Sequence, residues 1–437
     1  GSPLFVRATE VGESTKLAAI RHLMERAQAE KPPVVILADR VAGWFVALLL
    51  VLAVGAAGVW YALEPGRALW IFVSVLVVSC PCALSLATPA ALTAATGALS
   101  RLGLLPTRGH AIETLANATH FVFDKTGTLT EGRLQLVETI PLADIGAASA
   151  LEMAVALEGV SEHAIGAGFR DAAGGRDPAG AERVSAAVVT GQGIEGPLDG
   201  ITYRIGRIDY VADLTGSSLP ICGGEQAAET VVALGREGQW IALFRLRDRL
   251  RPTAAGLIKD LQAAGRHVCI LSGDGGGAVA AVAAELGVGD AHSGLTPKEK
   301  HDYIVALQRG GAVVAMIGDG VNDAPVLAQA QVSIAMGSGT DLARNQGDMV
   351  LLAEDLGRIA EGLRIARQTS RIVRQNLGWA FAYNAMAIPA AMLGWITPWM
   401  AGIGMSASSL LVVLNALRLA RGKASSTAGG AVAGTMC

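Results

Sequence analysis

An aspartate at the end of a short apolar run opens the segment Asp124-Lys125-Thr126-Gly127-Thr128-Leu129-Thr130. A carboxylate at the end of a strand can attack a phosphoryl group and form an acyl phosphate. The glycine and threonines that follow can surround the transferred oxygens with N–H and hydroxyl groups. The pattern predicts phosphoryl transfer at Asp124, with Lys125 and Thr126 in the same site. A lone aspartate would more often cap a turn, but the complete segment makes that reading a poor one.

A second acidic segment, Gly318-Asp319-Gly320-Val321-Asn322-Asp323, follows another apolar run. Because Mg²⁺ prefers carboxylate oxygens and retained waters, Asp319 and Asp323 are predicted to hold Mg²⁺ together with Asp124. Asn322 is predicted to belong to the catalytic set. Taken alone, this hexapeptide could be a simple Asp-Gly turn.

A third polar turn, formed by Ser272, Gly273 and Asp274, follows the apolar run at 268–271. In doubly wound sheets, ligands bind beyond the carboxyl ends of the strands. All three turns are therefore expected to converge on one catalytic site. Lys300 is a candidate cation for neutralising phosphate, although a lone lysine is more often a solvated surface residue.

The elements that must position these residues are short apolar runs at 120–123, 268–271 and 312–317. Such runs are typical of buried parallel strands. Helix-like stretches at 252–264 and 277–286 alternate with them, which predicts a doubly wound α/β domain. More than a hundred residues separate the first two strands. A second domain is therefore predicted to be inserted at 132–245.

Long uncharged runs lie on both sides of this central part, at 41–63, 68–100 and 377–417. Each of the first two is long enough to cross a bilayer. The last is expected to form two helices that are separated around Thr397-Pro398. Four membrane helices follow from this reading, and buried core helices are the alternative. Basic residues flank the outer ends of both pairs, so both termini and the catalytic domains are expected in the cytoplasm.

Composition agrees with a membrane protein, because 51% of the 437 residues are hydrophobic and only 17% are charged. A net charge of −3 argues against nucleic acid as a partner. Five cysteines in so long a chain do not make a disulfide framework.

Cys80 and Cys82 flank Pro81 within the second uncharged run. Thiolate ligands select Cu(I), and Pro81 is expected to kink the helix and turn both sulfur atoms inward. The alternative is a pair of small apolar cysteines packed between helices. The run at 377–417 contains no charged residue, which favours a monovalent cargo over a divalent one.

Together these motifs resemble those of the P-type ATPases, and the Cys-Pro-Cys triplet resembles the copper(I)-exporting subgroup of their heavy-metal-transporting branch. The resemblance implies a multi-domain fold. It comprises an α-helical transmembrane bundle and a haloacid dehalogenase-like α/β phosphorylation domain with an inserted α+β nucleotide-binding domain. Ser161-Glu162-His163 matches the adenine-contacting motif of that branch. The resemblance implies an ATP pocket lined by Glu158, His163, Gly191, Gly193 and Gly206.

The same resemblance implies further residues at the copper site. Tyr383-Asn384 and Met405, with Ser408-Ser409, are similar to the signatures of the copper(I) subgroup. The implied copper set is Cys80, Cys82, Tyr383, Asn384, Met405 and Ser409. The chain departs from the family pattern at three positions. Ala164 replaces a proline, Arg207 an asparagine and Ser272 a threonine.

The implied function is ATP-driven export of copper(I) from the cytoplasm through an aspartyl phosphate, in the cell inner membrane. The implied ligands and partners are Mg²⁺, ATP, membrane lipid, copper(I) and a cytoplasmic copper donor. The alternatives are a Zn(II)/Cd(II) pump, a catalytically incomplete metal-binding membrane fragment, and a membrane-tethered phosphatase. An inserted adenine pocket argues against the phosphatase.

The order of domains expected along the chain begins with the end of an actuator domain and a linker, whose Gly12-Glu13-Ser14 we interpret as a decoy of the water-positioning motif. Most of the actuator is expected to be missing, so this fragment alone is expected not to complete the cycle. The predicted boundaries are 1–40 for the actuator end, 41–100 for two membrane helices, 101–131 and 246–370 for the phosphorylation domain, 132–245 for the nucleotide-binding domain, 371–420 for two membrane helices and 421–437 for a disordered tail.

Overall fold

The computed structural model describes residues 33–78, 80, 82–159, 164–174, 186–189, 192–219, 229–320, 324–337, 347–352 and 354–420. The chain divides into two compact units. One comprises residues 1–118, 331–337 and 344–437, and the other comprises residues 119–330 and 338–343. This division differs from the domain boundaries predicted from the sequence, which stay a prediction. The predicted actuator end before residue 33 and the predicted tail at 421–437 lie outside the described residues.

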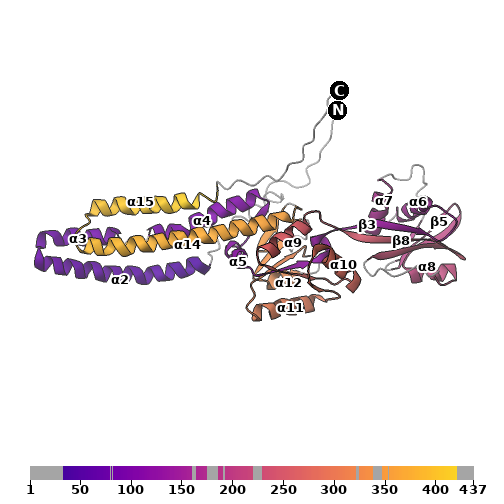
Figure 1. The fold of residues 1–437 in the computed structure, drawn as a ribbon, viewed down its shortest axis with the longest axis horizontal. Helices are drawn as coiled ribbons and strands as arrows, with labels where there is room; N and C mark the ends of the chain where they lie inside the picture. The colour runs from indigo at the N-terminus through magenta and orange to yellow at the C-terminus, as the bar shows by residue number, and fades with distance from the viewer. Residues whose placement is uncertain are drawn as a thin grey trace, which may run out of the picture. The chain divides into compact units, whose positions relative to one another are not determined.

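Long helices that pack side by side make up most of the described part of the first unit (Figure 1). They are α2 (Pro33–Leu63), α3 (Pro65–Val78), α4 (Cys82–Arg101), α14 (Gly357–Met392) and α15 (Pro398–Ala416). Both α3 and α4 contact α14 and α15. Small buried residues such as Ala53, Ala391 and Ala401 occupy the helix contacts, where they allow the backbones to approach closely.

The uncharged run at 68–100 does not form one kinked helix. Helix α3 ends at Val78, Cys80 belongs to neither helix, and α4 begins at Cys82. Pro81, where the kink is predicted, lies outside the described residues. The predicted separation of the last two helices is confirmed, because α15 begins at Pro398 with Thr397 as its N-cap.

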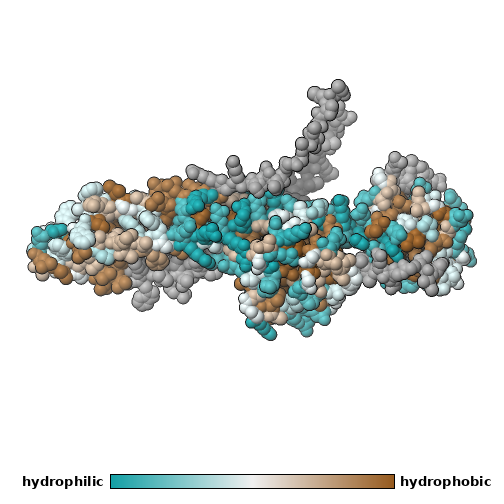
Figure 2. Space-filling model, viewed as in Figure 1, coloured by the Kyte–Doolittle hydropathy of each residue, from teal (hydrophilic) through white to brown (hydrophobic). Residues whose placement is uncertain are grey.

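The surface of the helices is strongly apolar. Trp70, Trp395 and Trp399 expose 65%, 72% and 67% of their area, and Figure 2 shows brown, hydrophobic patches over α15 and over the end where α2 and α3 meet. Among the described residues, α15 is the one helix that is both long and apolar enough to cross a membrane, and the other apolar helical stretches, which include residues 47–63 of α2 and all of α3, are shorter. An exposed apolar surface of this kind marks contact with lipid or protein.

The first unit also contains the strands β1 (Leu104–Pro106), β13 (Met349–Leu351) and β12 (Val332–Met336), in that order, and the short helix α5 (Ala111–Asn117). The pairing of β1 with β13 is antiparallel and that of β13 with β12 is parallel.

In the second unit, four strands lie in the order β11 (Val314–Gly318), β2 (His120–Asp124), β9 (His267–Leu271) and β10 (Asp290–His292). Each pairs in parallel with its neighbour. The helices that alternate with them are α9 (Ala254–Ala263), α10 (Gly276–Leu286), α11 (Pro297–Arg309) and α12 (Ala324–Gln329). The three strands and two helices predicted from the sequence are confirmed within two residues at each end.

An antiparallel sheet is inserted after β2. Its order is β3 (Thr130–Pro141), β8 (Gln239–Leu250), β7 (Thr230–Arg236), β6 (Ile201–Gly206), β5 (Gly193–Leu198) and β4 (Ala187–Val189). Helices α6 (Ala147–Glu158), α7 (Ala164–Ala172) and α8 (Ile208–Thr215) accompany it. Phe169 and Phe244 pack edge to face in its core, which is one of the arrangements that pairs of aromatic rings prefer.

Candidate active site and metal site

Parallel register brings the three polar turns of the second unit to one edge of the sheet. Asp124 is the last residue of β2 and pairs with Leu271, which directly precedes the Ser272 turn. On the other side of β2, Phe123 pairs with Ile317, and Asp319 follows one residue after β11 ends at Gly318. The predicted convergence of these turns is therefore observed for the described residues.

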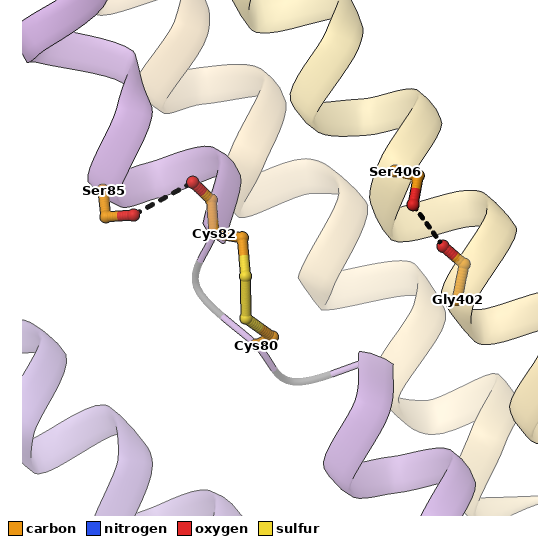
Figure 3. Close-up of a disulfide and its surroundings, with 5 residues drawn as sticks. All are labelled: Cys80, Cys82, Ser85, Gly402 and Ser406. Atoms are coloured by element: carbon orange, nitrogen blue, oxygen red, sulfur yellow. Dashed lines mark hydrogen bonds between the residues drawn. A yellow bond between two sulfur atoms is a disulfide. The ribbon is translucent and has the colours of Figure 1, made fainter.

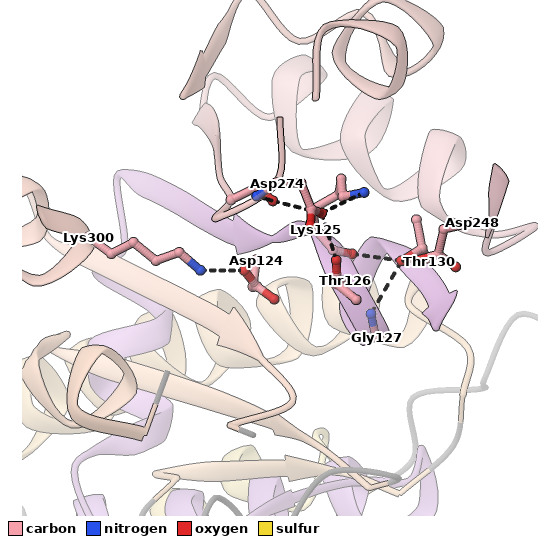
Figure 4. A network of polar contacts seen from close by, with 9 residues as sticks. Asp124, Lys125, Thr126, Gly127, Thr130, Asp248, Asp274 and Lys300 are labelled. Atoms are coloured by element: carbon pink, nitrogen blue, oxygen red, sulfur yellow. Dashed lines mark hydrogen bonds and ion pairs between the residues drawn. The ribbon is translucent and has the colours of Figure 1, made fainter. Parts of the chain in front are cut away.

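An ion pair joins Asp124 to Lys300. The Lys300 Nζ atom lies 2.7 Å from Asp124 Oδ1, and both side chains are almost fully buried (Figure 4). Lys300 lies on the first turn of α11, whose start is set by a capping box in which Thr296 and Glu299 bond to each other's backbone N–H. The local sequence thus fixes the helix start that delivers this ammonium to the aspartate.

A second ion pair holds the residue after Asp124. Lys125 Nζ lies 2.7 Å from Asp274 Oδ2, which also accepts hydrogen bonds from the hydroxyls of Thr126 and Ser272. Burial raises the pKa of Asp274, but Lys125 and these hydroxyls outweigh it, so that the pKa lies below its usual value. Serine at position 272 therefore still supplies the hydroxyl group that threonine has in the family.

Gly127 is the one position of this turn where only glycine fits. Its φ of +73° is in the left-handed region, and a Cβ built there would collide with the Asp319 carboxylate. The collision shows that the carboxylate of Asp319 lies directly against the turn that follows Asp124. Two of the three predicted magnesium ligands thus belong to one site.

Sequence reasoning missed two residues that hold the turn. The Thr130 hydroxyl, which accepts a hydrogen bond from the Gly127 N–H, lies 2.6 Å from Asp248 Oδ2. Arg251 donates to the carbonyls of Gly127 and Thr128. Burial raises the pKa of Asp248, although the Thr130 hydroxyl opposes this effect. The available signal was the charged stretch just before Pro252, where the inserted sheet returns to the α/β part.

Some predicted catalytic and nucleotide-binding residues lie outside the described residues. They are Asn322, Asp323, His163 and Gly191. Glu158 is described and is buried at the end of α6.

Gly193 and Gly206 are paired partners in β5 and β6. A Cβ on Gly206 would lie 2.6 Å from the Cα of Gly193, and one on Gly193 would lie 2.8 Å from the Cα of Gly206. Both glycines are therefore required by the close approach of the two strands. A contact with nucleotide stays a prediction for each.

The Cys-Pro-Cys triplet differs from its prediction. The structure joins Cys80 and Cys82 in a disulfide at the break between α3 and α4 (Figure 3). The two cysteines are therefore not free thiols in this structure. Cys80 and Cys82 are two positions apart, and outside a continuous helix their sulfur atoms can come within bonding distance. A disulfide sulfur is not a thiolate, so the copper assignment stays a prediction and applies to the reduced pair.

The helices on either side of the two cysteines pack against α14 and α15, which carry the other predicted copper residues. Ala83, next to Cys82, shares a buried cluster with Ala380 and Val412 of α14 and α15. Val78, two residues before Cys80, shares another cluster, against which Tyr383 packs. The break between α3 and α4 therefore faces both of the helices that carry the remaining candidates.

The predicted copper residues on α14 and α15 differ in burial and in their contacts. Asn384 is buried, and its Oδ1 has no hydrogen-bond partner in the described part of the chain. The Tyr383 hydroxyl lies against the backbone of Gly404, where a Cβ would come within 2.7 Å of it. Met405 and Ser409 are half-buried on α15.

The four parallel strands, three of which are followed by or end in an aspartate (Asp124, Asp274 and Asp319), have the arrangement of a haloacid dehalogenase-like domain. Residues 118–331 match a family model described as haloacid dehalogenase-like hydrolase, and residues 302–363 match a second model with that description.

Comparison with curated proteins finds relatives over nearly the whole chain. The chain is 39% identical over 425 residues to "Probable copper-exporting P-type ATPase V" of Mycobacterium tuberculosis, covering 96% of this chain and 55% of that protein. It is 36% identical over 432 residues to "Copper-exporting P-type ATPase" of Bacillus subtilis, covering 96% and 53%. The chain thus spans about half the length of the curated relatives it matches.

Comparison with solved structures gives the same family. A zinc-transporting PIB-type ATPase in the E2.Pi state matches with a TM-score of 0.76 and 30% identity, covering 94% of this chain and 68% of that one. The chain belongs to the PIB-type ATPases. The predicted fold is thereby confirmed: a membrane helix bundle and a haloacid dehalogenase-like α/β domain with an inserted α+β nucleotide-binding domain.

Proposed function

We propose that Asp124 accepts the γ-phosphoryl group of ATP and that this step drives export of copper(I) from the cytoplasm. The observation that carries the proposal is the buried Asp124 carboxylate, held 2.7 Å from the Lys300 ammonium at the end of β2. An aspartate in this position can act as a nucleophile. An Asp124 oxygen would form a bond to the γ-phosphorus while the bond to the bridging oxygen of ADP breaks.

The residues around Asp124 fit this reaction. The Lys300 ammonium offsets the negative charge of Asp124, which lowers the repulsion that an anionic phosphoryl group meets. Lys125 and Asp274 neutralise each other, and Arg251 holds two carbonyls of the intervening turn. The turn is therefore fixed before substrate arrives, as positioning of the phosphoryl group requires.

A magnesium ion fits the same site. The carboxylates of Asp124 and Asp319 are the hard oxygen ligands that Mg²⁺ prefers, and Gly127 leaves the space in which the Asp319 carboxylate lies. The third proposed ligand, Asp323, is outside the described residues. When bound, Mg²⁺ supplies positive charge to the phosphate oxygens. ATP is proposed to bind at the inserted sheet, near Glu158 and the pair Gly193 and Gly206.

Copper(I) is proposed as the cargo on three grounds. Two relatives that match the chain are named as copper-exporting. The sulfur atoms of Cys80 and Cys82 lie together, and Met405 offers a thioether on α15, a helix that contacts both α3 and α4. No charged residue occurs at 377–417, so a monovalent ion is buried there at a lower cost than a divalent one.

Zinc is the second candidate, because the matching solved structure is of a zinc-transporting protein. Zn²⁺ prefers four ligands, commonly with a histidine or carboxylate among them. The helices α14 and α15 offer neither after residue 376.

The basic residues outside the predicted spans support an inner-membrane orientation with both termini and the catalytic domains in the cytoplasm. In that orientation copper would reach the site from a cytoplasmic donor.

Because this fragment alone is expected not to complete the cycle, the proposal is tested by transport into inside-out membrane vesicles that carry this chain joined to a complete actuator domain. With ATP, Mg²⁺ and a reductant, we expect uptake of Cu(I), lost on Asp124→Asn and on Cys82→Ser. The matched control is Cys222→Ser, a cysteine outside the predicted spans. Uptake of Zn(II) in place of Cu(I), through the same cysteines, would establish the zinc alternative. Uptake of either ion by Asp124→Asn would overturn the assignment of the nucleophile.

A further inference from the structure

A cluster of metal-ligating side chains on β9 and β10 contains none of the predicted catalytic residues. The thiol of Cys269, the carboxylate of Asp290 and the imidazole of His292 place one ligand atom each within 4.8 Å of one another. Tyr303 of α11 adds a hydroxyl, 3.1 Å from Asp290 Oδ2 and 3.7 Å from Cys269 Sγ. None of these residues is used in the proposed phosphoryl transfer or copper site.

We propose that this cluster binds a borderline-soft divalent cation of the zinc type, through Cys269 Sγ, an Asp290 oxygen and His292 Nε2. Sulfur, oxygen and nitrogen ligands together are the set that Zn²⁺ accepts. Tyr303 or water completes the four ligands. Binding replaces the S–H bond of Cys269 by a sulfur–metal bond and releases one proton to solvent.

The sheet register explains why these side chains meet. Asp290 is paired with Cys269 across the parallel strands β10 and β9. Side chains alternate between the two faces of a strand. His292, two residues after Asp290, therefore lies on the same face as the pair. The three ligands follow from backbone pairing and do not depend on a flexible loop.

The distances suit a small tetrahedral ion after a modest side-chain adjustment. Bonds of about 2.0–2.3 Å to a tetrahedral Zn²⁺ place the ligand atoms roughly 3.3–3.6 Å apart. His292 Nε2 now lies 2.9 Å from Asp290 Oδ1, so these two atoms must move apart slightly, and the Cys269 thiol lies within 4.8 Å of both. Cys269 is buried, whereas Asp290 is exposed and His292 is about two-fifths exposed, so a cation can enter from the Asp290 side.

The cluster is joined to the predicted catalytic turn through the backbone. The His292 carbonyl accepts a hydrogen bond from the Ser272 N–H at 2.9 Å. Tyr303 lies on α11, the helix that also carries Lys300. A bound cation would therefore tie β10, β9 and α11 together beside the site that they build.

Cobalt(II) absorption tests the proposal, because a cobalt–thiolate bond gives an intense charge-transfer band. The protein is the full chain with Cys80→Ser, Cys82→Ser, Cys222→Ser and Cys437→Ser, which leaves Cys269 as its one thiol. We expect one equivalent of Co²⁺ to produce the band, and Zn²⁺ to displace it. Adding Cys269→Ser should abolish the band.

Cys269 is buried, so its replacement perturbs the core, and His292→Gln provides a second, more exposed variant. We expect it to weaken Co²⁺ binding by at least about tenfold. The matched control is His301→Gln, which changes a half-buried histidine of α11 that pairs with Asp302 and should bind Co²⁺ as the parent does. Adding Asp124→Asn should also leave binding unchanged, which separates this site from the proposed phosphoryl transfer. Absence of a charge-transfer band in the parent, or a band that survives Cys269→Ser, would overturn the proposal.

Discussion

The predicted catalytic site and the predicted copper site differ in the charge of their buried polar groups. In the catalytic site, Asp124 and Asp274 each lie 2.7 Å from a buried lysine. In the helix bundle, the buried Asn384 Oδ1 has no hydrogen-bond partner among the described residues. The catalytic turn also holds two buried oxygens without a hydrogen-bond partner among the described residues, Thr128 Oγ1 and Asp248 Oδ1. The two sites therefore differ in charge pairing: the first holds its buried charges in ion pairs, and the second presents a neutral, unpartnered amide oxygen, which is costly to bury.

The comparison is tested most strongly by Lys300→Met. Removing the ammonium beside the buried Asp124 is expected to lower the free energy of unfolding by about 3–5 kcal/mol. It is also expected to slow phosphorylation by about 10²–10³-fold. Denaturant unfolding and phosphorylation from labelled ATP measure the two effects. Lys298→Met, at an exposed position of the same helix, is the control and should change neither. Normal phosphorylation in Lys300→Met would show that the ion pair is only structural.

A smaller loss is expected from Gly127→Ala. The substituted residue must keep a left-handed φ and also displace Asp319, so we expect a loss of about 2–4 kcal/mol together with weaker Mg²⁺ dependence of phosphorylation. Gly132→Ala is the matched control, because its φ is +67° but the nearest atom to its Cβ is 3.7 Å away. It should lose about 1–2 kcal/mol from backbone strain alone. Equal losses in the two variants would argue against a crowded Asp319.

In the helix bundle the sign of the effect is expected to reverse. Asn384→Leu removes an unsatisfied buried oxygen, so it should stabilise the protein and raise its free energy of unfolding by about 1–3 kcal/mol. The same change should weaken Cu(I) binding. Asn376 is the control, since it is buried on the same helix but donates to the Val412 carbonyl and accepts from Asn415. Asn376→Leu should destabilise the protein. Thermal unfolding in detergent compares them, and destabilisation by both changes would remove the contrast between the sites.

The smallest effect concerns a departure from the family pattern. Arg207 is the N-cap of α8, and no side-chain capping bond is made there. An arginine has donors only and cannot accept a helix N–H. Its side chain instead pairs with Asp209. Arg207→Asn should supply the cap and raise Tm by about 2–4 °C, as differential scanning calorimetry would show. An unchanged Tm would mean that the exposed Arg207–Asp209 pair is worth as much as the cap.

Sequence pattern predicted the α/β part of the molecule well, for a physical reason. Buried parallel strands are continuous apolar runs, and their carboxyl ends share one edge. The turns that contain Asp124, Ser272 and Asp319 could therefore be brought together without knowledge of the structure. The pairing of Lys300 with Asp124 depended on a helix start that a capping box marks in the sequence.

Other features could not be read from pattern alone. Asp248 and Arg251 contact the turn only because β8 returns beside β3, a pairing between residues more than a hundred positions apart. The break that separates α3 from α4 could not be predicted because a proline in an apolar run is equally compatible with a kink within one helix, and the pattern gave no sign of a disulfide between Cys80 and Cys82.

The central claim is that Asp124 is the phosphorylated residue, and labelling of the reduced protein with γ-labelled ATP, Mg²⁺ and Cu(I) tests it most directly. An acyl phosphate on Asp124 should survive acid and be released by hydroxylamine. The label should disappear in Asp124→Asn and persist in Asp260→Asn, which changes an exposed aspartate of α9. A hydroxylamine-labile label that persists in Asp124→Asn would contradict the account.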